Sequence, residues 1–187
     1  AGLPIVSFID QAALDSWLAL QPRDSGGAWI RIRKKGSAVA SATKAEAIDS
    51  ALCYGWIDGQ LDKYDDDSWL IRFTPRRPRS KWSQVNRKRA LELIAAGRMQ
   101  PYGQSEIDNA KVDGRWEAAY APASKAEVPP DLRAALDVNP KAAAFFARLT
   151  GANRYAILYR IGVVKKAETR ARKIVDFVAM LEREETV

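Results

Sequence analysis

The stretch WIDGQLDKYDDDSWLIRFT, residues 56–74, decides the fold of the N-terminal half of the chain. Residues 56–61 and 68–74 are rich in β-branched and aromatic side chains, which favour strands. Between them lies the acidic turn, residues 62–67. Two such runs joined by a short polar turn predict an antiparallel hairpin. Pro75 and Pro78 end the second strand, because proline lacks an amide hydrogen and restricts the residue before it.

The flanking sequence supplies the other elements of this half. Residues 28–33 alternate between apolar and polar side chains, which predicts a third, half-buried strand. A short amphipathic helix is expected over residues 8–20. Thr43 and Glu46 have the spacing of a capping box, which predicts a helix that ends at Gly55. This half is therefore predicted to be a small antiparallel sheet with flanking helices.

A further helix is predicted directly after the prolines. Ser80 is expected to cap a helix over residues 81–96. Asn86 and Arg89 fall on the apolar face of that helix, where an unpaired amide or guanidinium is costly. Each should therefore have a partner. The acids nearest in sequence are Asp58 and those of the acidic turn.

The C-terminal half is predicted to be helical. Helices are expected over residues 103–113, 130–137, 140–149, 154–165 and 168–183. The helix over 154–165 is apolar nearly all round and is expected to be the most buried, with Asn153 as its cap. The predicted class is α+β, with an α+β domain over residues 1–116, a linker or long loop over 117–130, and a helical module over 131–187 packed on the first domain.

Composition excludes several kinds of chemistry. The 187 residues include no histidine and one cysteine, Cys53, so imidazole catalysis and an internal disulfide are excluded. Cys53 is expected to be a small core residue. The sequence contains neither a signal peptide nor an apolar run long enough to span a membrane, which predicts a cytoplasmic protein. No phosphate-binding loop, dinucleotide fingerprint or zinc ligand set is present, so no cofactor and no metal is predicted.

Charge is segregated along the chain. The net charge is +7, yet residues 72–91 contain eight basic side chains and no acid. Residues 148–173 contain eight basic side chains against one acid, and residues 58–67 carry a net charge of −4. Clustered positive charge attracts phosphates and other anionic surfaces. The alternative is that the acidic and basic segments neutralise each other or cover a solvated surface.

The basic segment after the hairpin is the best candidate for a functional site. Prolines hold it extended, its arginines suit carboxylate or phosphate, and a helix start at Ser80 would attract anions. The sequence predicts the following anion-binding residues: Trp56, Asp58, Arg72, Arg76, Arg77, Arg79, Ser80, Trp82, Asn86 and Arg89. The leading hypothesis is a non-enzymatic binding protein that recognises an anionic ligand or protein surface.

Two alternatives remain open at this point. A basic pI near 9.6 and interleaved arginine and tryptophan also fit a nucleic-acid-binding module. A small-molecule enzyme could use Asp58 as general base beside Arg76 or Arg79. No catalytic residue is assigned, and the oligomeric state is not predicted.

Several segments together resemble a known family. These are residues 51–60 (ALCYGWIDGQ), 72–83 (RFTPRRPRSKWS) with Asn86, 97–99 (GRM), 110–116 (AKVDGRW) and 165–172 (KKAETRAR). They resemble the YdeI/OmpD-associated family, also called bacteriocin-protection proteins. The resemblance implies a small bacterial protein with a helical C-terminal module and a role in stress protection. It brings no established reaction and no catalytic residues.

Overall fold

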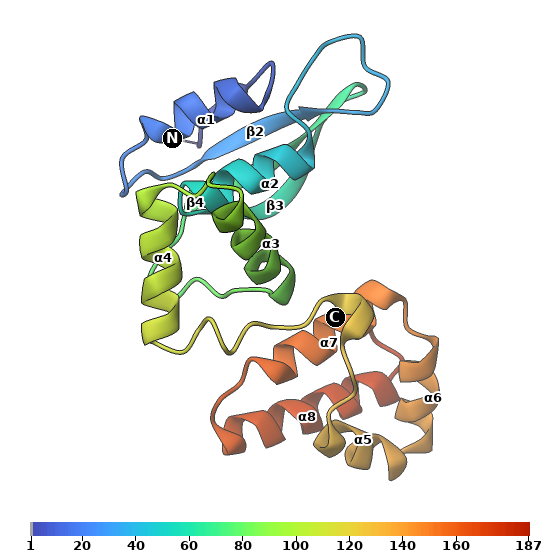
Figure 1. Ribbon diagram of the computed structural model, residues 1–187. Helices are drawn as coiled ribbons and strands as arrows, with labels where there is room; N and C mark the ends of the chain where they lie inside the picture. The colour runs from blue at the N-terminus through green and yellow to red at the C-terminus, as the bar shows by residue number, and fades with distance from the viewer. Residues whose placement is uncertain (1) are drawn as a thin grey trace. The chain divides into compact units, whose positions relative to one another are not determined.

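A computed structural model describes residues 2–187, with the backbone alone for Ser124. The chain divides into two compact units, one up to Ala119 and one from Tyr120 on (Figure 1). The first unit contains β1 (Ile5–Ser7), α1 (Gln11–Ala19), β2 (Ala28–Arg33), α2 (Lys44–Cys53), β3 (Trp56–Asp65), β4 (Ser68–Pro75), α3 (Gln84–Ala95) and α4 (Pro101–Val112). The second contains the 3-10 turn η1 (Ala123–Lys125), α5 (Pro130–Asp137), α6 (Pro140–Arg148), α7 (Gly151–Gly162) and α8 (Ala167–Glu182). Over the described residues, no helix has both the length and the apolar character that crossing a membrane requires.

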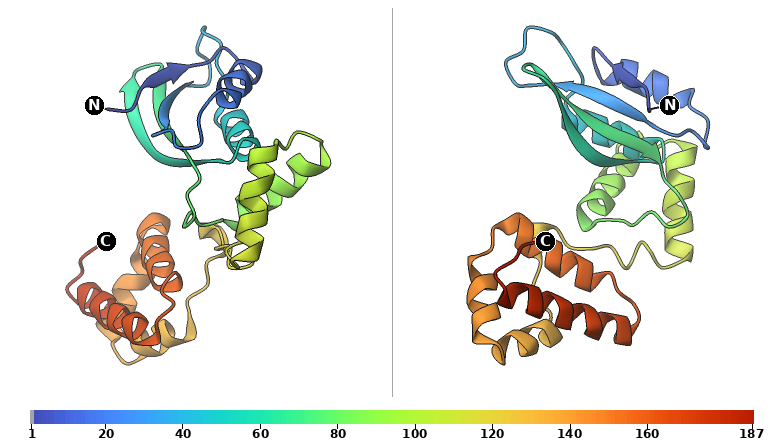
Figure 2. Two further views of the ribbon diagram at one scale, coloured as in Figure 1. Left: turned by 90° about the vertical axis from the view of Figure 1, so that its left-hand side faces the viewer. Right: turned by 180° about the vertical axis from the view of Figure 1, so that it is seen from behind.

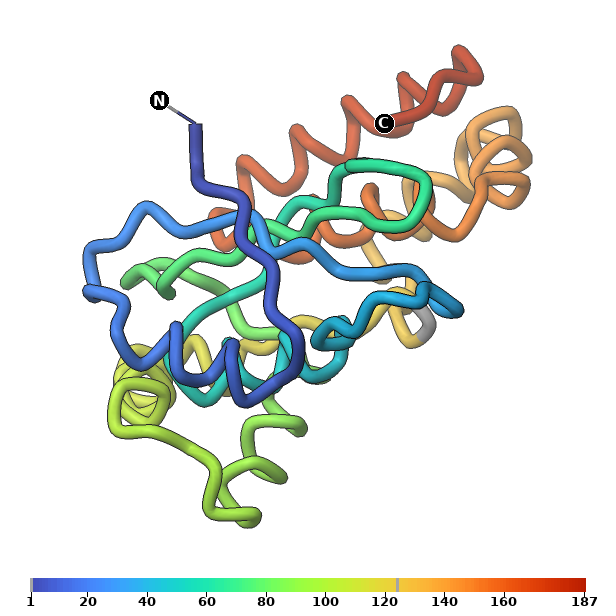
Figure 3. Tube along the Cα trace, turned by 90° about the horizontal axis from the view of Figure 1, so that it is seen from above, coloured from blue at the N-terminus to red at the C-terminus, as the bar shows by residue number. Residues whose placement is uncertain are grey.

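The first unit is built on one sheet with the strand order β1-β2-β4-β3. β4 pairs antiparallel with both β2 and β3, as the hairpin pattern predicts. β1 was not expected from the sequence and pairs parallel with β2. Parallel neighbours need a crossover, and the chain passes through α1 before it returns to β2 (Figure 3). The predicted α+β class is confirmed, with one parallel strand added.

Helices α1 and α2 cover one face of this sheet (Figures 1 and 2). Buried and half-buried side chains alternate along β2, so that Ile30 and Ile32 face the core. Trp17 of α1 packs edge-on against Trp56 of β3, with ring centroids 5.7 Å apart. The predicted capping box at the start of α2 is confirmed. The main core of the first unit therefore lies between these two helices and one face of the sheet.

The hairpin turn is shorter than predicted. β3 continues to Asp65, and only two residues separate it from β4. Asp65 accepts hydrogen bonds from the hydroxyl of Ser68 at 2.6 Å and from the backbone amide of Asp67 at 3.0 Å, and it also pairs with Arg31. These contacts hold the carboxylate at the point where the pairing of β3 with β4 shifts register, between Lys63 and Asp65. The sequence pattern did not predict that β3 continues to Asp65, because aspartate is uncommon in strands.

The predicted start of α3 is wrong. Ser83, not Ser80, is the N-cap, and its hydroxyl accepts a hydrogen bond from the Asn86 amide at 3.0 Å. Ser80 instead closes a turn with Arg77. Serine is a favoured N-cap residue, so the sequence alone does not predict whether Ser80 or Ser83 begins the helix.

The second unit is a bundle in which α8 packs against α5, α6 and α7. α7 was expected to be the most buried helix, but only Ile157, Leu158 and Ile161 of it are buried. Thr150 rather than Asn153 caps it. Much of the predicted linker belongs to this unit, because Ala126 and Val128 pack against its core.

Candidate functional site

The basic loop, residues 76–83, joins β4 to α3 and is closed by a tight turn. The Ser80 amide donates to the Arg77 carbonyl at 2.8 Å, and the Arg77 amide donates to the Ser80 hydroxyl at 2.9 Å. The Arg76 amide donates to the carbonyl of Gly55 at 2.9 Å, which ties the loop to the end of α2. The loop backbone is therefore fixed by specific hydrogen bonds.

Arg76, predicted to meet a ligand, is instead the inner anchor of this loop. Its side chain is buried, with 4% of the residue exposed. The guanidinium lies 3.6 Å from the centre of the Trp82 ring and donates to the Lys81 carbonyl at 3.2 Å. The face of an aromatic ring attracts a guanidinium, and this attraction is stronger where water is excluded. The structure thus places Arg76 inside the protein.

Trp82 does not present an accessible stacking surface. It is buried, with Arg76 over its ring and Trp116 edge-on at 4.8 Å between centroids. Nearby, Arg115 donates to the Ser80 carbonyl at 2.9 Å. The segment after α4 therefore supports the basic loop. Sequence reasoning assigned no role to Arg115 or Trp116, although both lie in one of the segments that carried the family resemblance.

Arg77 and Arg79 project from the anchored loop. Both are exposed. Over the described residues neither side chain forms an ion pair or hydrogen bond with another group. Arg72, on β4, is exposed as well, and its Nε lies 3.7 Å from the point where a Cβ on Gly59 would stand. Of the predicted site residues, these three arginines are exposed and form no ion pair over the described residues.

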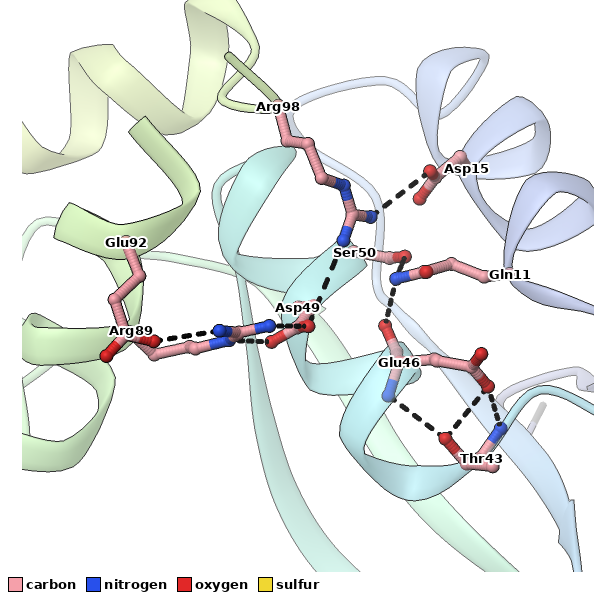
Figure 4. Close-up of polar contacts among 9 residues, drawn as sticks. All are labelled: Gln11, Asp15, Thr43, Glu46, Asp49, Ser50, Arg89, Glu92 and Arg98. Carbon is pink, nitrogen blue, oxygen red and sulfur yellow. Dashed lines mark hydrogen bonds and ion pairs between the residues drawn. The ribbon is translucent and has the colours of Figure 1, made fainter. Parts of the chain in front are cut away.

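Arg89 has a partner, as predicted, but not one of the predicted acids. Its guanidinium donates to both carboxylate oxygens of Asp49 on α2, at 2.6 and 2.5 Å, and to Glu92 at 2.8 Å (Figure 4). The guanidinium nitrogens of Arg98 lie 3.6 Å from a carboxylate oxygen of Asp15 and 3.9 Å from one of Asp49. Hydrogen bonds to Asp49 and Glu92 raise the pKa of Arg89 further above its usual range. This cluster joins α1, α2 and α3 and is structural.

The other predicted residues do not assemble around the basic loop. Trp56 is buried in the sheet core. Asp58 is half-buried on β3 opposite Phe73, and over the described residues its side chain makes no ion pair or hydrogen bond. Asn86 lies in the first turn of α3, where its backbone amide donates to the Ser83 hydroxyl. Its side chain is half-buried and forms no hydrogen bond over the described residues, so the partner predicted for it is not found. Whether the predicted residues bind an anion remains a prediction.

One acidic neighbour of the basic loop was missed. Glu106 of α4 is half-buried, and burial raises the pKa of its carboxyl, against the effect of Arg115, Arg76 and Arg23. Burial thus favours the neutral form of this carboxyl, whereas the three arginines favour its charged form. No sequence spacing links Glu106 to residues some 30 positions away. Over residues 2–187, no group of three or more cysteine or acidic side chains is placed to hold a metal ion.

Cys53 is buried at the end of α2, as predicted, and burial raises the pKa of its thiol from 9.0 to about 11. The thiolate is the reactive form. We therefore expect alkylation by iodoacetamide at pH 8, followed by mass spectrometry, to be on the order of 100-fold slower in the native protein than in urea. Equal rates in both states would contradict the placement of Cys53.

The same pKa shift has a consequence for stability. The native thiol keeps its proton at pH values where the unfolded thiol ionises. The contribution of Cys53 to stability is thus fully present below pH 9 and is lost as the pH rises through about 11.

Two family models match different parts of the chain. A domain of unknown function, DUF8412, matches residues 6–106, more than half of the chain. The chain belongs to the DUF8412 family. The model described as Bacteriocin-protection, YdeI or OmpD-Associated matches residues 125–184 of this DUF8412 protein, which confirms the predicted resemblance for the second unit. No significant match to a curated protein or to a solved structure is found.

The two matches divide the chain close to the boundary between its compact units. The YdeI/OmpD-associated match covers one of the five quoted segments, residues 165–172. The segments within residues 51–99 fall in the DUF8412 match, and residues 110–116 lie in neither match. In the DUF8412 protein, the first unit therefore matches a domain of unknown function, and the second unit is similar to YdeI/OmpD-associated proteins.

Proposed function

We propose that this chain is a non-enzymatic binding protein of the bacteriocin-protection type, which recognises an anionic partner through the basic loop. The match of residues 125–184 supports the protective role. The single observation that carries the binding proposal is the pair of exposed, unpaired arginines, Arg77 and Arg79, on a loop with a fixed backbone.

The anchoring of the loop favours binding for an energetic reason. Ordering a flexible loop on binding costs free energy, and a loop that is already ordered avoids most of that cost. The turn at Ser80, the stacked Arg76 and the contact from Arg115 hold this loop before any partner arrives. Planar guanidinium groups then recognise carboxylate or phosphate with two parallel hydrogen bonds.

The geometry supports an enzyme less well. General-base catalysis by Asp58 beside Arg76 would need both groups at one cleft. The Arg76 guanidinium is instead stacked on Trp82, and the Asp58 side chain has no arginine partner in the part of the chain that the structure describes. No reaction is therefore proposed for this chain.

Charge reversal of the exposed pair tests the binding proposal. We expect Arg77→Glu/Arg79→Glu to elute from immobilised heparin, a polyanion, at a clearly lower salt concentration than the unchanged protein. Arg133→Glu/Arg172→Glu is the matched control, because both residues are exposed, form no ion pair over the described residues, and change the net charge equally. An equal shift in both variants would show that only net charge matters and would overturn the assignment to the basic loop.

Protection is tested in cells with the same two variants. Bacteria that express the unchanged chain should survive exposure to a bacteriocin better than bacteria without it. We expect the loop variant to lose most of this advantage and the control variant to keep it. Full protection by the loop variant would separate the protective role from the basic loop.

A further inference from the structure

The second face of the sheet in the first unit carries no helix of that unit (Figure 2). We call this the outer sheet face. On it, Ile5, Trp29 and Arg72 form one row across β1, β2 and β4, because Trp29 is paired with both of the others. Arg31 and Arg33 follow Trp29 at alternate positions along β2 and therefore share its face. The half-buried Trp29 thus shares a sheet face with three arginines.

The charges on this face are only partly neutralised. Arg31 is held by Asp65 and donates to the Ser68 hydroxyl at 2.7 Å, while its guanidinium lies 4.6 Å from the centre of the Tyr64 ring. Over residues 2–187, the side chains of Arg33 and Arg72 form no ion pair. The outer sheet face therefore retains two guanidinium groups for an external anion.

The carboxylates nearest to these arginines lie on the β3–β4 hairpin. Asp62 lies on the same face, at the edge strand β3, because it is paired with Leu70. Its carboxylate accepts a hydrogen bond from the backbone amide of Lys63 at 2.8 Å. Lys35, in the loop after β2, is exposed and adds positive charge. Ser68, which is paired with Arg33, directly follows the acidic turn, so the carboxylates of that turn lie at the Arg33 end of this face. Arg72 is paired with Trp29 and lies four residues further along β4, away from the turn.

A hollow of about 250 Å³ opens at the β1–β2 end of this face. Its lining combines apolar, hydroxyl and guanidinium groups: Ser7, Phe8, Ile9, Arg31, Arg33, Val39, Ala40 and Ser41. Ile9 and Val39 are largely exposed despite being apolar. A planar, partly polar ring that carries a phosphate needs this combination, because the ring contacts apolar atoms while the phosphate pairs with arginine.

We propose that the outer sheet face binds single-stranded nucleic acid. A base stacks on Trp29 or enters the hollow, and Arg33 and Arg72 contact phosphates on either side. Aromatic side chains on an open sheet, flanked by basic residues, are suited to unpaired bases. A duplex offers its bases only within grooves that a broad sheet face does not enter. This proposal uses none of the residues of the basic loop and goes beyond the proposed function.

Fluorescence anisotropy with a short fluorescein-labelled oligothymidylate tests the proposal on the full chain. We expect Trp29→Leu, which keeps apolar volume but cannot stack, to bind about tenfold more weakly, and Trp29→Phe to lose less. The slope of log affinity against log salt should stay unchanged in both. Arg33→Gln/Arg72→Gln should weaken binding and reduce that slope by about 0.7 for each lost phosphate contact.

The controls separate this site from the basic loop. Arg133→Gln/Arg172→Gln should bind like the unchanged protein, and circular dichroism should show that each variant is folded. The proposal is overturned if the outer-face variants bind as well as the unchanged protein, or if the unchanged protein does not bind at low salt. It is also overturned if polyphosphate, which has no bases, displaces the probe as well as unlabelled oligothymidylate does. Loss of binding only in Arg77→Glu/Arg79→Glu would transfer the nucleic-acid site to the basic loop.

Discussion

Trp82→Ala is expected to lower the free energy of unfolding of the first unit by about 3–5 kcal/mol, the usual cost of removing a buried tryptophan. The ring is 1% exposed and lies between Arg76 and Trp116. Its loss leaves a cavity and also leaves a buried guanidinium without its aromatic neighbour. Urea unfolding followed by tryptophan fluorescence measures this change, since all six tryptophans lie before residue 120.

Trp82→Phe is the matched control, because it keeps an aromatic ring beneath Arg76. It should cost clearly less than the alanine variant. If Trp82→Ala costs under about 1 kcal/mol, the core beneath the basic loop is not packed as described. In a folded Trp82→Ala protein, weaker binding to heparin would further support the view that anchoring of the loop prepares Arg77 and Arg79 for a partner.

Gly103→Ala is expected to lower the free energy of unfolding by about 3 kcal/mol, at the upper end of the usual cost of overpacking. Gly103 lies on α4, where the helix crosses the end of α2. A Cβ at this position would stand 2.2 Å from the Cys53 carbonyl oxygen and 2.6 Å from the Met99 sulfur. The Met99 side chain can move, but the carbonyl belongs to the backbone, so the two helices must separate.

Gly59→Ala is the control for this prediction. A Cβ there would meet the Arg72 carbonyl at 3.5 Å, an ordinary contact, so we expect a change within about 0.5 kcal/mol. The same urea experiment applies to both variants. Equal stabilities would show that α4 does not approach α2 as closely as the structure indicates.

The ionic cluster at Arg89 illustrates the limit of sequence reasoning for the site. The position of Arg89 on the helix indicated correctly that the guanidinium needs a partner. Its partner, Asp49, is 40 residues away and lies on a helix that sequence proximity did not suggest. The periodicity of one helix predicts which side chains face inward, whereas the packing of two helices decides what they meet.

The basic loop shows the same limit. Prolines and arginines in residues 75–79 predicted an extended basic segment. They did not predict that Arg76 would be buried against Trp82, or that Arg115, 35 residues beyond Ser80, would hold the turn. The accessible pair, Arg77 and Arg79, therefore follows from which neighbours the tertiary structure supplies. The sequence around these arginines does not indicate which of them is buried and which are exposed.

The amino-acid sequence by itself determined the α+β class, the hairpin and the capped start of α2, because each depends on side chains a few residues apart. The tertiary structure decided the parallel strand β1, the partner of Arg89, and which arginines stay exposed. It also placed Trp29 and Arg72 side by side on the sheet face that carries no helix of the first unit. These features depend on contacts between segments distant in sequence, whose geometry no local pattern encodes.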